Sequence, residues 1–210
     1  MRGLMLNDLY NIGHNAKQIL LIVVVWGICF AGSSDTGSYL VMFPVLFCMM
    51  TATTFSFDEK CGWTKYAMVF PVTRRDYVLE KYLVNFLFSL AGTLIGVALT
   101  LAANAVRGKE MDGSLGIYAM IGICIGLLVG GIFIPLLFRF GAEKARLILV
   151  AAVLIPVGVY VLLQHLLEEM DIVLTQQMIE DMIYVLPVGA VILSAVTFFI
   201  SVHIFSGKEF

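Results

Sequence analysis

Six apolar segments constrain the fold of this chain more than any other feature of its sequence. A helix needs about 20 mostly apolar residues to cross the roughly 30 Å hydrocarbon layer of a membrane, and all but the first segment meet or approach that length. Soluble domains carry about 25% charged residues, whereas this chain has 13% charged and 60% hydrophobic residues. The pattern therefore predicts an all-α integral membrane protein with six transmembrane helices. The segments lie in one domain, 1–210, at roughly residues 18–32, 39–57, 82–106, 115–138, 147–166 and 183–205.

The first segment is the shortest and allows two interpretations. It reads KQILLIVVVWGICFA and ends in GSSDTGS, so it could cross the membrane as a tilted helix or across a locally thinned bilayer. A secretory signal peptide is the competing interpretation. No small-x-small cleavage site follows the apolar run, which favours a helix that the mature protein retains.

The basic residues predict the orientation of the helices. Lys and Arg are enriched in cytoplasmic loops, and six crossings place all but two of the thirteen basic residues on the side that carries both termini. The two exceptions, Arg107 and Lys109, lie between the third and fourth segments. We therefore expect both termini in the cytoplasm. The loops on the other side contain many of the carboxylates, so the outer face should be acidic.

Missing motifs exclude several classes of function. The apolar segments contain very few charged residues, whereas ion-coupled carriers usually need buried carboxylates or bases in mid-membrane. No HExxH or GxSG sequence of a protease occurs. The two Gly-Lys pairs, at Gly108 and Gly207, lack the other residues of a phosphate-binding loop. We therefore predict no catalytic residue, metal site or cofactor in this chain and no nucleic-acid partner. Any ATPase, with its ATP and Mg²⁺, would be a separate subunit.

Small residues recur at four-residue spacing in two segments. The fourth segment carries Gly122, Gly126 and Gly130, and the third carries Gly92 and Gly96. Small residues at this spacing let helix backbones approach closely in membranes. We expect these glycines to mark tight helix packing, within the subunit or across a dimer.

The longest polar stretch, residues 58–81, reads DEKCGWTKYAMVFPVTRRDYVLEK and holds five of the basic residues. Proline removes a backbone donor and disfavours helix at the preceding residue, so Pro71 should end any helix here. The pattern predicts a surface helix on the cytoplasmic side that begins near Asp58. Three aromatic residues of that helix recur at the spacing of one helix face: Trp63, Tyr66 and Phe70.

A second helix should follow the proline. Thr73, followed three residues later by Asp76, forms the pattern of a capping box. We expect the new helix to begin near Arg74 and to run unbroken through Lys81 into the third apolar segment. The polar stretch is then a short surface helix, a hinge and a long helix that enters the membrane.

The residues alone leave two interpretations of this stretch. It could be an amphipathic helix that rests in lipid headgroups, with Arg74 and Arg75 on anionic lipid. It could instead be a coupling helix that sits in a groove of an ATPase and transmits movement to the membrane helices.

Residues 54–83 resemble the permease subunits of the type-2 class of ATP-binding-cassette transporters, in the compact bacterial branch with six membrane helices and little else. The similar elements are Phe-x-x-Asp-Glu-Lys, Gly-Trp-x-x-Tyr, Pro-Val-Thr-Arg and Lys-Tyr-Leu. The resemblance implies a bacterial plasma-membrane protein whose segment 58–81 contacts a cytoplasmic ATP-binding subunit through a coupling helix. The contact residues that it implies are Asp58, Glu59, Lys60, Gly62, Trp63 and Tyr66, with Arg74 and Arg75 behind them.

Two further features of that class have counterparts here. An N-terminal amphipathic helix could be formed by residues 1–17, with Met5, Leu9 and Ile12 on one side and Asp8 elsewhere. Short re-entrant helices on the outside, between the fifth and sixth spans, could be formed by residues 166–184. Five carboxylates in that stretch would give the outer rim a negative potential.

The resemblance implies an obligate dimer, homo- or heteromeric, that is bound to two ATPases and exports a substrate. The spans offer apolar, Thr-rich and aromatic walls, so the substrate should be amphiphilic, such as a peptide, a toxin or an antimicrobial. Two alternatives remain open. The chain could be a membrane anchor or sensor that uses the same loop without transport, or the same fold could act as a bacteriocin immunity pump.

Overall fold

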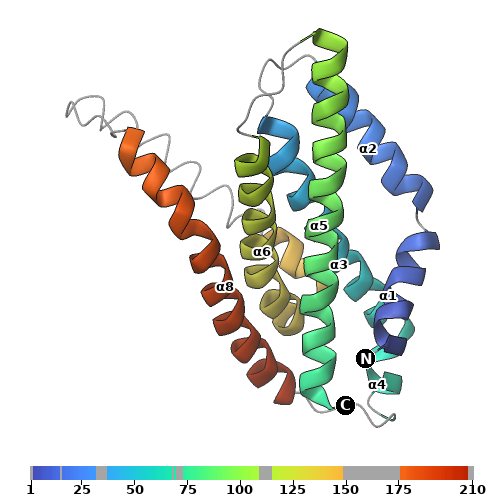
Figure 1. Cartoon of the computed structure of the whole chain (residues 1–210). Helices are drawn as coiled ribbons and strands as arrows, with labels where there is room; N and C mark the ends of the chain where they lie inside the picture. Colours follow the sequence, from blue (N-terminus) through green and yellow to red (C-terminus); the bar gives the residue numbers. More distant parts are fainter. Residues whose placement is uncertain are drawn as a thin grey trace.

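The computed structural model of the chain describes residues 2–14, 16–31, 37–67, 69, 73–108, 115–148 and 176–207 (Figure 1). Within these ranges all regular structure is helical, without strands, as the sequence predicts. A further helical stretch covers residues 142–148. The labelled helices are α1 (Arg2–His14), α2 (Ala16–Ala31), α3 (Gly37–Cys61), α4 (Trp63–Ala67), α5 (Arg74–Arg107), α6 (Leu115–Phe140) and α8 (Gln176–Ser206).

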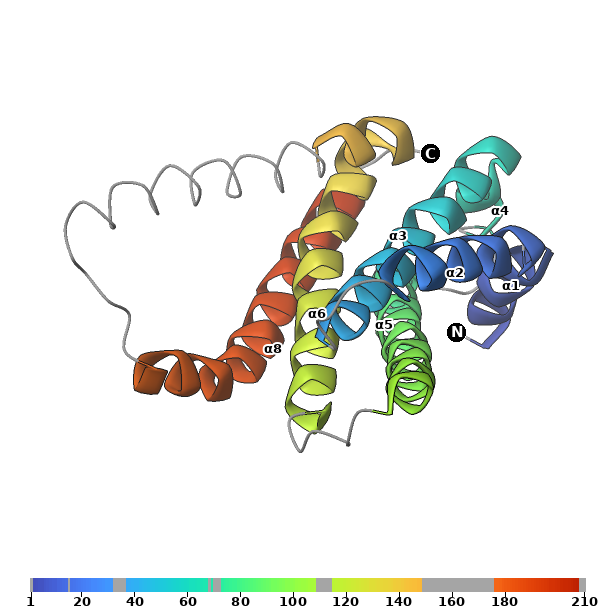
Figure 2. The same cartoon turned by 90° about the horizontal axis from the view of Figure 1, so that it is seen from above.

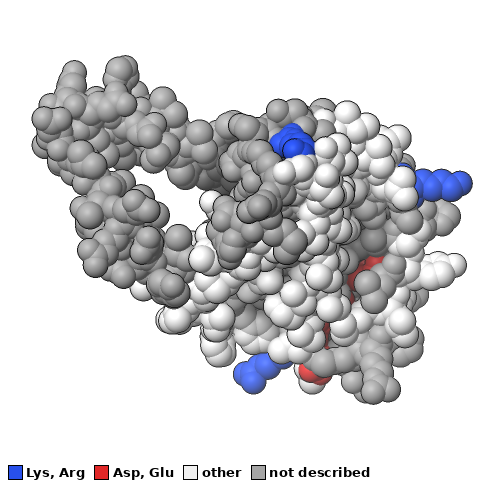
Figure 3. Space-filling model, turned by 45° about the horizontal axis from the view of Figure 1, so that its top comes forward, with Lys and Arg blue, Asp and Glu red and all other residues white. Residues whose placement is uncertain are grey.

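Four of the described helices are long and apolar enough to cross a membrane, and they coincide with the second, third, fourth and sixth predicted spans. The first predicted span corresponds to α2, whose 16 residues give a length of about 24 Å, less than the hydrocarbon layer. Almost all of the fifth predicted span lies outside the described residues. Charged side chains are few on the surface shown in Figure 3, as expected for helices in contact with lipid.

Helices α3, α5 and α6 pack against one another and form the centre of the bundle. Helix α8 packs mainly on α6, and Figure 2 shows α6 between α8 and the α3–α5 pair. Helices α1 and α2 lie on the other side, next to α3, with α1 also contacting α5. Helix α1, helix α4, the beginning of α5 and the end of α8 lie at one end of the bundle (Figure 1), called the α4 end below.

The predicted glycine positions lie where helices approach most closely. A methyl group on Gly92 would lie 2.7 Å from the carbonyl oxygen of Phe43, and one on Gly96 would lie 2.9 Å from that of Tyr39. Both carbonyls belong to α3, so α5 packs directly on the α3 backbone. The three glycines of α6 meet α3 and α5: Gly122 meets the carbonyl of Leu40, Gly126 the side chain of Ser89 and Gly130 the amide of Asn85. These approaches are all within one subunit.

An aromatic cluster holds four helices together at the α4 end. Tyr77 of α5 stacks on Phe205 of α8, with ring centroids 5.1 Å apart. Phe138 of α6 contacts Phe205 at 5.1 Å and meets Phe55 of α3 edge to face at 4.9 Å. All four rings are buried. Edge-to-face and stacked pairs add about 0.5–1.5 kcal/mol each beyond their buried area, so this end of the bundle is well fixed.

Helix α1 covers most of the expected N-terminal helix, and its buried residues include Leu4 and Asp8, while Leu6 and Tyr10 are exposed. One expectation changes at the other peripheral helix. Residues 176–184, expected in re-entrant helices, form the first turns of α8 and continue without interruption to Ser206. The rest of the expected re-entrant stretch, 166–175, lies outside the described residues.

Candidate functional site at the α4 end

The surface helix expected from Asp58 begins later than predicted. Helix α3 continues through Asp58 to Cys61 and ends because Gly62 adopts φ +64°. A left-handed residue after the last turn is a common helix stop, and glycine adopts it without steric cost. Helix α4 then covers only Trp63–Ala67. The first residues of the predicted surface helix are thus the last turn of a membrane-spanning helix.

The predicted restart of the helix is confirmed. The hydroxyl of Thr73 accepts a hydrogen bond from the backbone N–H of Asp76 at 3.2 Å, and the N–H of Thr73 donates to the Asp76 carboxylate at 3.3 Å. This reciprocal pair is a capping box. Helix α5 begins at Arg74 and runs unbroken to Arg107. The last part of the polar stretch, from Arg74 onward, therefore belongs to the long α5 helix.

A buried group of charged residues joins three helices at the α4 end. The ammonium of Lys81 lies 2.7 Å from a carboxylate oxygen of Asp8 in α1 and 2.8 Å from one of Asp58 in α3. Glu80, beside Lys81 in α5, has a carboxylate oxygen 3.7 Å from the same ammonium. Each of these four side chains is at most 2% exposed. We call Asp8, Asp58, Tyr77, Glu80 and Lys81 the junction.

Aromatic groups complete the surroundings of Lys81. The hydroxyl of Tyr77 donates a hydrogen bond to Asp58 at 3.0 Å. The Lys81 ammonium also lies 5.2 Å from the ring centroid of Phe55 and 5.4 Å from that of Tyr77, which are cation–π distances. Removing one partner of a buried ion pair is strongly destabilising, since the other charge is left unpaired. The junction therefore holds α1, α3 and α5 in a fixed arrangement.

Two members of the junction lie elsewhere than expected. Lys81 was expected in a loop and Asp58 in contact with a partner, but both are buried inside this chain. A signal for Lys81 was present, because Lys81, Asn85 and Ser89 recur every four residues on one face of α5 and all are buried. No local signal pointed to Asp8, which lies 73 positions before Lys81.

The other predicted contact residues divide between the surface and the interior. Glu59, Lys60, Tyr66 and Arg75 are exposed. Gly62, Trp63 and Arg74 are partly buried, and Trp63 packs against the hydrophobic core. Trp63 and Tyr66 therefore do not form one outward face. Two large side chains near α4 are exposed: Tyr66 at 66% and Val69 at 84%.

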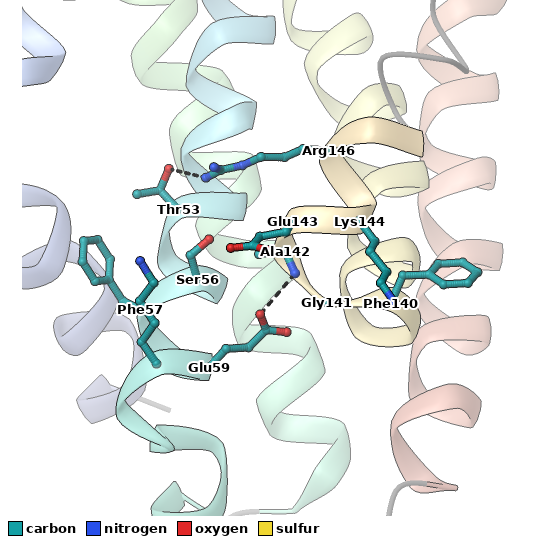
Figure 4. Close-up of a pocket in the computed structure, with 11 residues that line it drawn as sticks. Thr53, Ser56, Phe57, Glu59, Phe140, Gly141, Ala142, Glu143, Lys144 and Arg146 are labelled. Atoms are coloured by element: carbon teal, nitrogen blue, oxygen red, sulfur yellow. Dashed lines mark hydrogen bonds between the residues drawn. The ribbon is translucent and has the colours of Figure 1, made fainter.

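Glu59 connects the end of α3 to the helix that follows α6. One of its carboxylate oxygens accepts a hydrogen bond from the backbone N–H of Ala142 at 3.2 Å, at the start of the helical stretch 142–148. Gly141, just before it, has φ +79°. Arg146 of the same stretch donates a hydrogen bond to the Thr53 hydroxyl of α3 at 3.3 Å. A pocket of about 460 Å³ lies between these two elements (Figure 4).

Arg74 connects the beginning of α5 to the end of α8. Its guanidinium donates hydrogen bonds to the backbone carbonyls of Phe205, at 3.2 Å, and Ser206. The last carbonyls of a helix have no partner within the helix, and a cation there also complements the helix dipole. Arg74 therefore caps α8, whereas its neighbour Arg75 faces outward.

These observations define a polytopic helical membrane protein with exposed residues around α4, among them Glu59, Tyr66 and Val69, and with Glu59 bound to the helical stretch 142–148. The family model of the ABC-2 family transporter proteins matches residues 3–206. The chain belongs to this family, and it is an ABC-2 type permease. No curated protein and no solved structure matches the chain. ATPase activity in such a transporter generally resides in a partner subunit.

Proposed function

We propose that the chain is the membrane subunit of an ATP-driven exporter in the bacterial plasma membrane. In this proposal it has six spans, both termini in the cytoplasm, and a second permease subunit in a homo- or heterodimer. A separate cytoplasmic subunit binds ATP and Mg²⁺. Membership of the ABC-2 family supports this function, and so does the lack of a phosphate-binding loop in the sequence.

The docking surface of the ATP-binding subunit is the exposed segment around α4. Tyr66 and Val69 present apolar surface to the outside, at 66% and 84% exposure. Lys60, Cys61 and Lys65, which are close to them in sequence, are exposed as well. Aromatic residues at the centre of a patch, with charges at its rim, are typical of protein interfaces. A lipid headgroup layer would also fit a basic, aromatic surface, so the occupant is the first point to test.

The observation that carries the proposal is the attachment of this exposed segment to the membrane helices. Asp58, three residues before the end of α3, pairs with Lys81 of α5, which also holds Asp8 of α1. Glu59 caps the helical stretch 142–148 and Arg74 caps α8. A displacement of the end of α3 would therefore act on α1, α5 and the stretch 142–148, and a displacement of the beginning of α5 would act on α8. A segment that only rested on lipid would not need these connections.

The apolar outer faces of the helices support an amphiphilic substrate. Many buried polar groups of the bundle have partners inside it; for example, Cys48 and Thr51 of α3 both donate to the amide oxygen of Asn85 at 3.1 and 3.4 Å. The outward residues of α8 are large and apolar, including Val188 and Phe199. A substrate that passes along such faces must be partly apolar. A peptide, a toxin or an antimicrobial has this chemistry, and export as bacteriocin immunity would use the same surfaces.

Purification of the full chain from bacterial membranes tests the proposal. An ATP-binding subunit should co-purify in about equal amount, and Tyr66→Ala should reduce its yield by tenfold or more if this residue is a hot spot. Val106→Ala is the matched control, because Val106 is 89% exposed but lies at the other end of α5. If no ATP-binding subunit co-purifies and another enzyme does, the chain is an anchor or sensor.

Labelling of Cys61 gives an independent measurement of docking. Cys61 is exposed beside α4, whereas Cys48 and Cys124 are buried. In a Cys29→Ser background, a maleimide should label Cys61 in the free permease and should label it much more slowly in the complex. Anionic vesicles without the ATP-binding subunit are the control. If the vesicles protect Cys61 and the subunit does not, the segment binds lipid and the docking proposal fails.

A further inference from the structure

Glu80 is a buried acid that the proposed function does not use. Its side chain is 1% exposed, and its nearer carboxylate oxygen lies 3.7 Å from the ammonium of Lys81, beyond hydrogen-bond distance. Among the residues that the structure describes, neither carboxylate oxygen of Glu80 has a hydrogen-bond partner. A buried charge without a hydrogen bond is among the least favourable states of a carboxylate.

The ammonium of Lys81 is already engaged by other carboxylates. Asp8 and Asp58 lie within 2.8 Å of it, and Asp58 receives a second hydrogen bond from Tyr77. The groups that face Glu80 are thus Asp8 from α1, Asp58 from α3, and Tyr77 and Lys81 from α5. With all three carboxylates ionised, one ammonium would be surrounded by three negative charges. That imbalance in a buried site is unfavourable both through desolvation and through repulsion between like charges.

We propose that the junction is a proton-binding site, in which Glu80 holds a proton at neutral pH. In water at pH 7 a glutamate is ionised about 500 times more often than it is protonated. For Glu80 to be mostly protonated, the site must reverse this ratio of ionised to protonated glutamate. Burial favours the protonated form, and so do the two neighbouring carboxylates. Of the three carboxylates, Glu80 is the one that carries the proton. Asp8 and Asp58 each accept a hydrogen bond from the Lys81 ammonium, whereas Glu80 accepts one from neither an ammonium nor a hydroxyl among the described residues.

A metal ion is the other ligand that a group of acids could suggest. Within the described part of the chain, no group of three His, Cys, Asp or Glu side chains is arranged to hold one. Lys81 occupies the centre of the junction, where a metal would have to sit between the carboxylates. The ligand that fits is therefore a proton.

Proton binding links the junction to the position of α1. If α1 moved away and water entered, Glu80 would ionise and add a negative charge beside Lys81. The closed junction thus binds one more proton than the open or unfolded form. By linkage, the free energy that stabilises the closed form falls as the pH rises. This inference concerns the permease alone and holds whether or not an ATP-binding subunit docks.

Infrared spectroscopy of the full chain in lipid bilayers tests the proposal directly. A protonated carboxyl has a carbonyl stretching band that a carboxylate lacks. At neutral pH the wild-type protein should show this band, and Glu80→Gln should lose the corresponding intensity. Glu143→Gln is the matched control, because Glu143 is an exposed glutamate outside the junction, and it should retain the band. No loss of intensity in Glu80→Gln, or the same loss in Glu143→Gln, would overturn the assignment.

Thermal unfolding at several pH values gives a second readout. Glu80→Gln keeps an uncharged side chain of nearly the same shape, so its melting temperature near pH 7 should be within a few degrees of the wild type. Between pH 6 and 9 the wild type should lose stability with rising pH relative to Glu80→Gln. Parallel pH profiles, or a strongly destabilised Glu80→Gln at pH 7, would contradict a bound proton.

Discussion

Lys81→Met tests whether the junction holds the bundle together, because methionine keeps the buried stem of the side chain and removes only its charge. Two carboxylates that lie 2.7 and 2.8 Å from the Lys81 ammonium would be left without a counter-ion. Breaking a buried ion pair in this way costs about 3–5 kcal/mol. For a chain of this size each kcal/mol lowers the melting temperature by about 2–4 °C. We therefore expect Lys81→Met to melt roughly 6–20 °C below the wild type in detergent.

The controls separate loss of pairing from loss of a lysine. Lys65 is exposed in α4, and Lys65→Met should change stability by no more than about 0.5 kcal/mol. The triple variant Lys81→Met, Asp8→Asn and Asp58→Asn removes the unpaired charges together with the ammonium. It should recover most of the lost stability, since a buried ion pair itself contributes little over neutral groups. Equal melting temperatures for Lys81→Met and Lys65→Met would refute the burial of this ion pair. A triple variant as unstable as Lys81→Met would refute its electrostatic cause.

Three further substitutions test the packing and the helix ends. Gly122→Ala should prevent stable folding, since the new methyl group would overlap the Leu40 carbonyl. Gly116→Ala is the control. It should melt like the wild type, because no atom lies within 4 Å of its new methyl group. Thr73→Ala removes the capping box and should lower stability by about 1 kcal/mol, measured by thermal unfolding; Thr73→Ser should not. Gly62→Ala forces a residue with a Cβ to φ +64°, which costs about 1–2 kcal/mol. Proteolysis near α4 measures this strain. Slower cleavage of the variant than of the wild type would contradict it.

Local patterns predicted the helices and their ends better than they predicted the junction. The capping box at Thr73 and the start of α5 at Arg74 follow from residues three positions apart, and both are observed. The glycines at four-residue spacing lie at close helix contacts, because nothing larger fits between those backbones. The end of α3 was misplaced, since the charges at Asp58 to Lys60 looked like the start of a surface loop. The helix instead continues to the first residue that adopts a left-handed conformation, Gly62.

The burial of charged side chains was harder to predict from the sequence than the helices were. Asp58, Lys81 and Arg74 lie in the most polar stretch of the chain, and charge alone suggests solvent. Lys81 pairs with Asp8 of α1 and Arg74 with the end of α8, far away in the sequence, while Asp58 pairs with Lys81 across 23 positions. Only the fold brings these groups together. The periodicity of α5 did contain the clue that Lys81 faces inward, at four-residue spacing with Asn85.

Some of the predicted contact residues are buried and others are exposed. This difference has a mechanical reason. A segment that only docked a partner could expose every polar residue, but it would then move independently of the membrane helices. Here Tyr66 is available for docking, while Asp58, Glu59 and Arg74 bind α5, the stretch 142–148 and α8. Substitutions at the two kinds of residue should therefore fail differently. Tyr66→Ala should lose the ATP-binding subunit from a stable permease, whereas Asp58→Asn should retain the exposed docking surface and weaken the link from the end of α3 to α5. If both variants lost the subunit to the same degree, docking and transmission would not be separate properties of this segment.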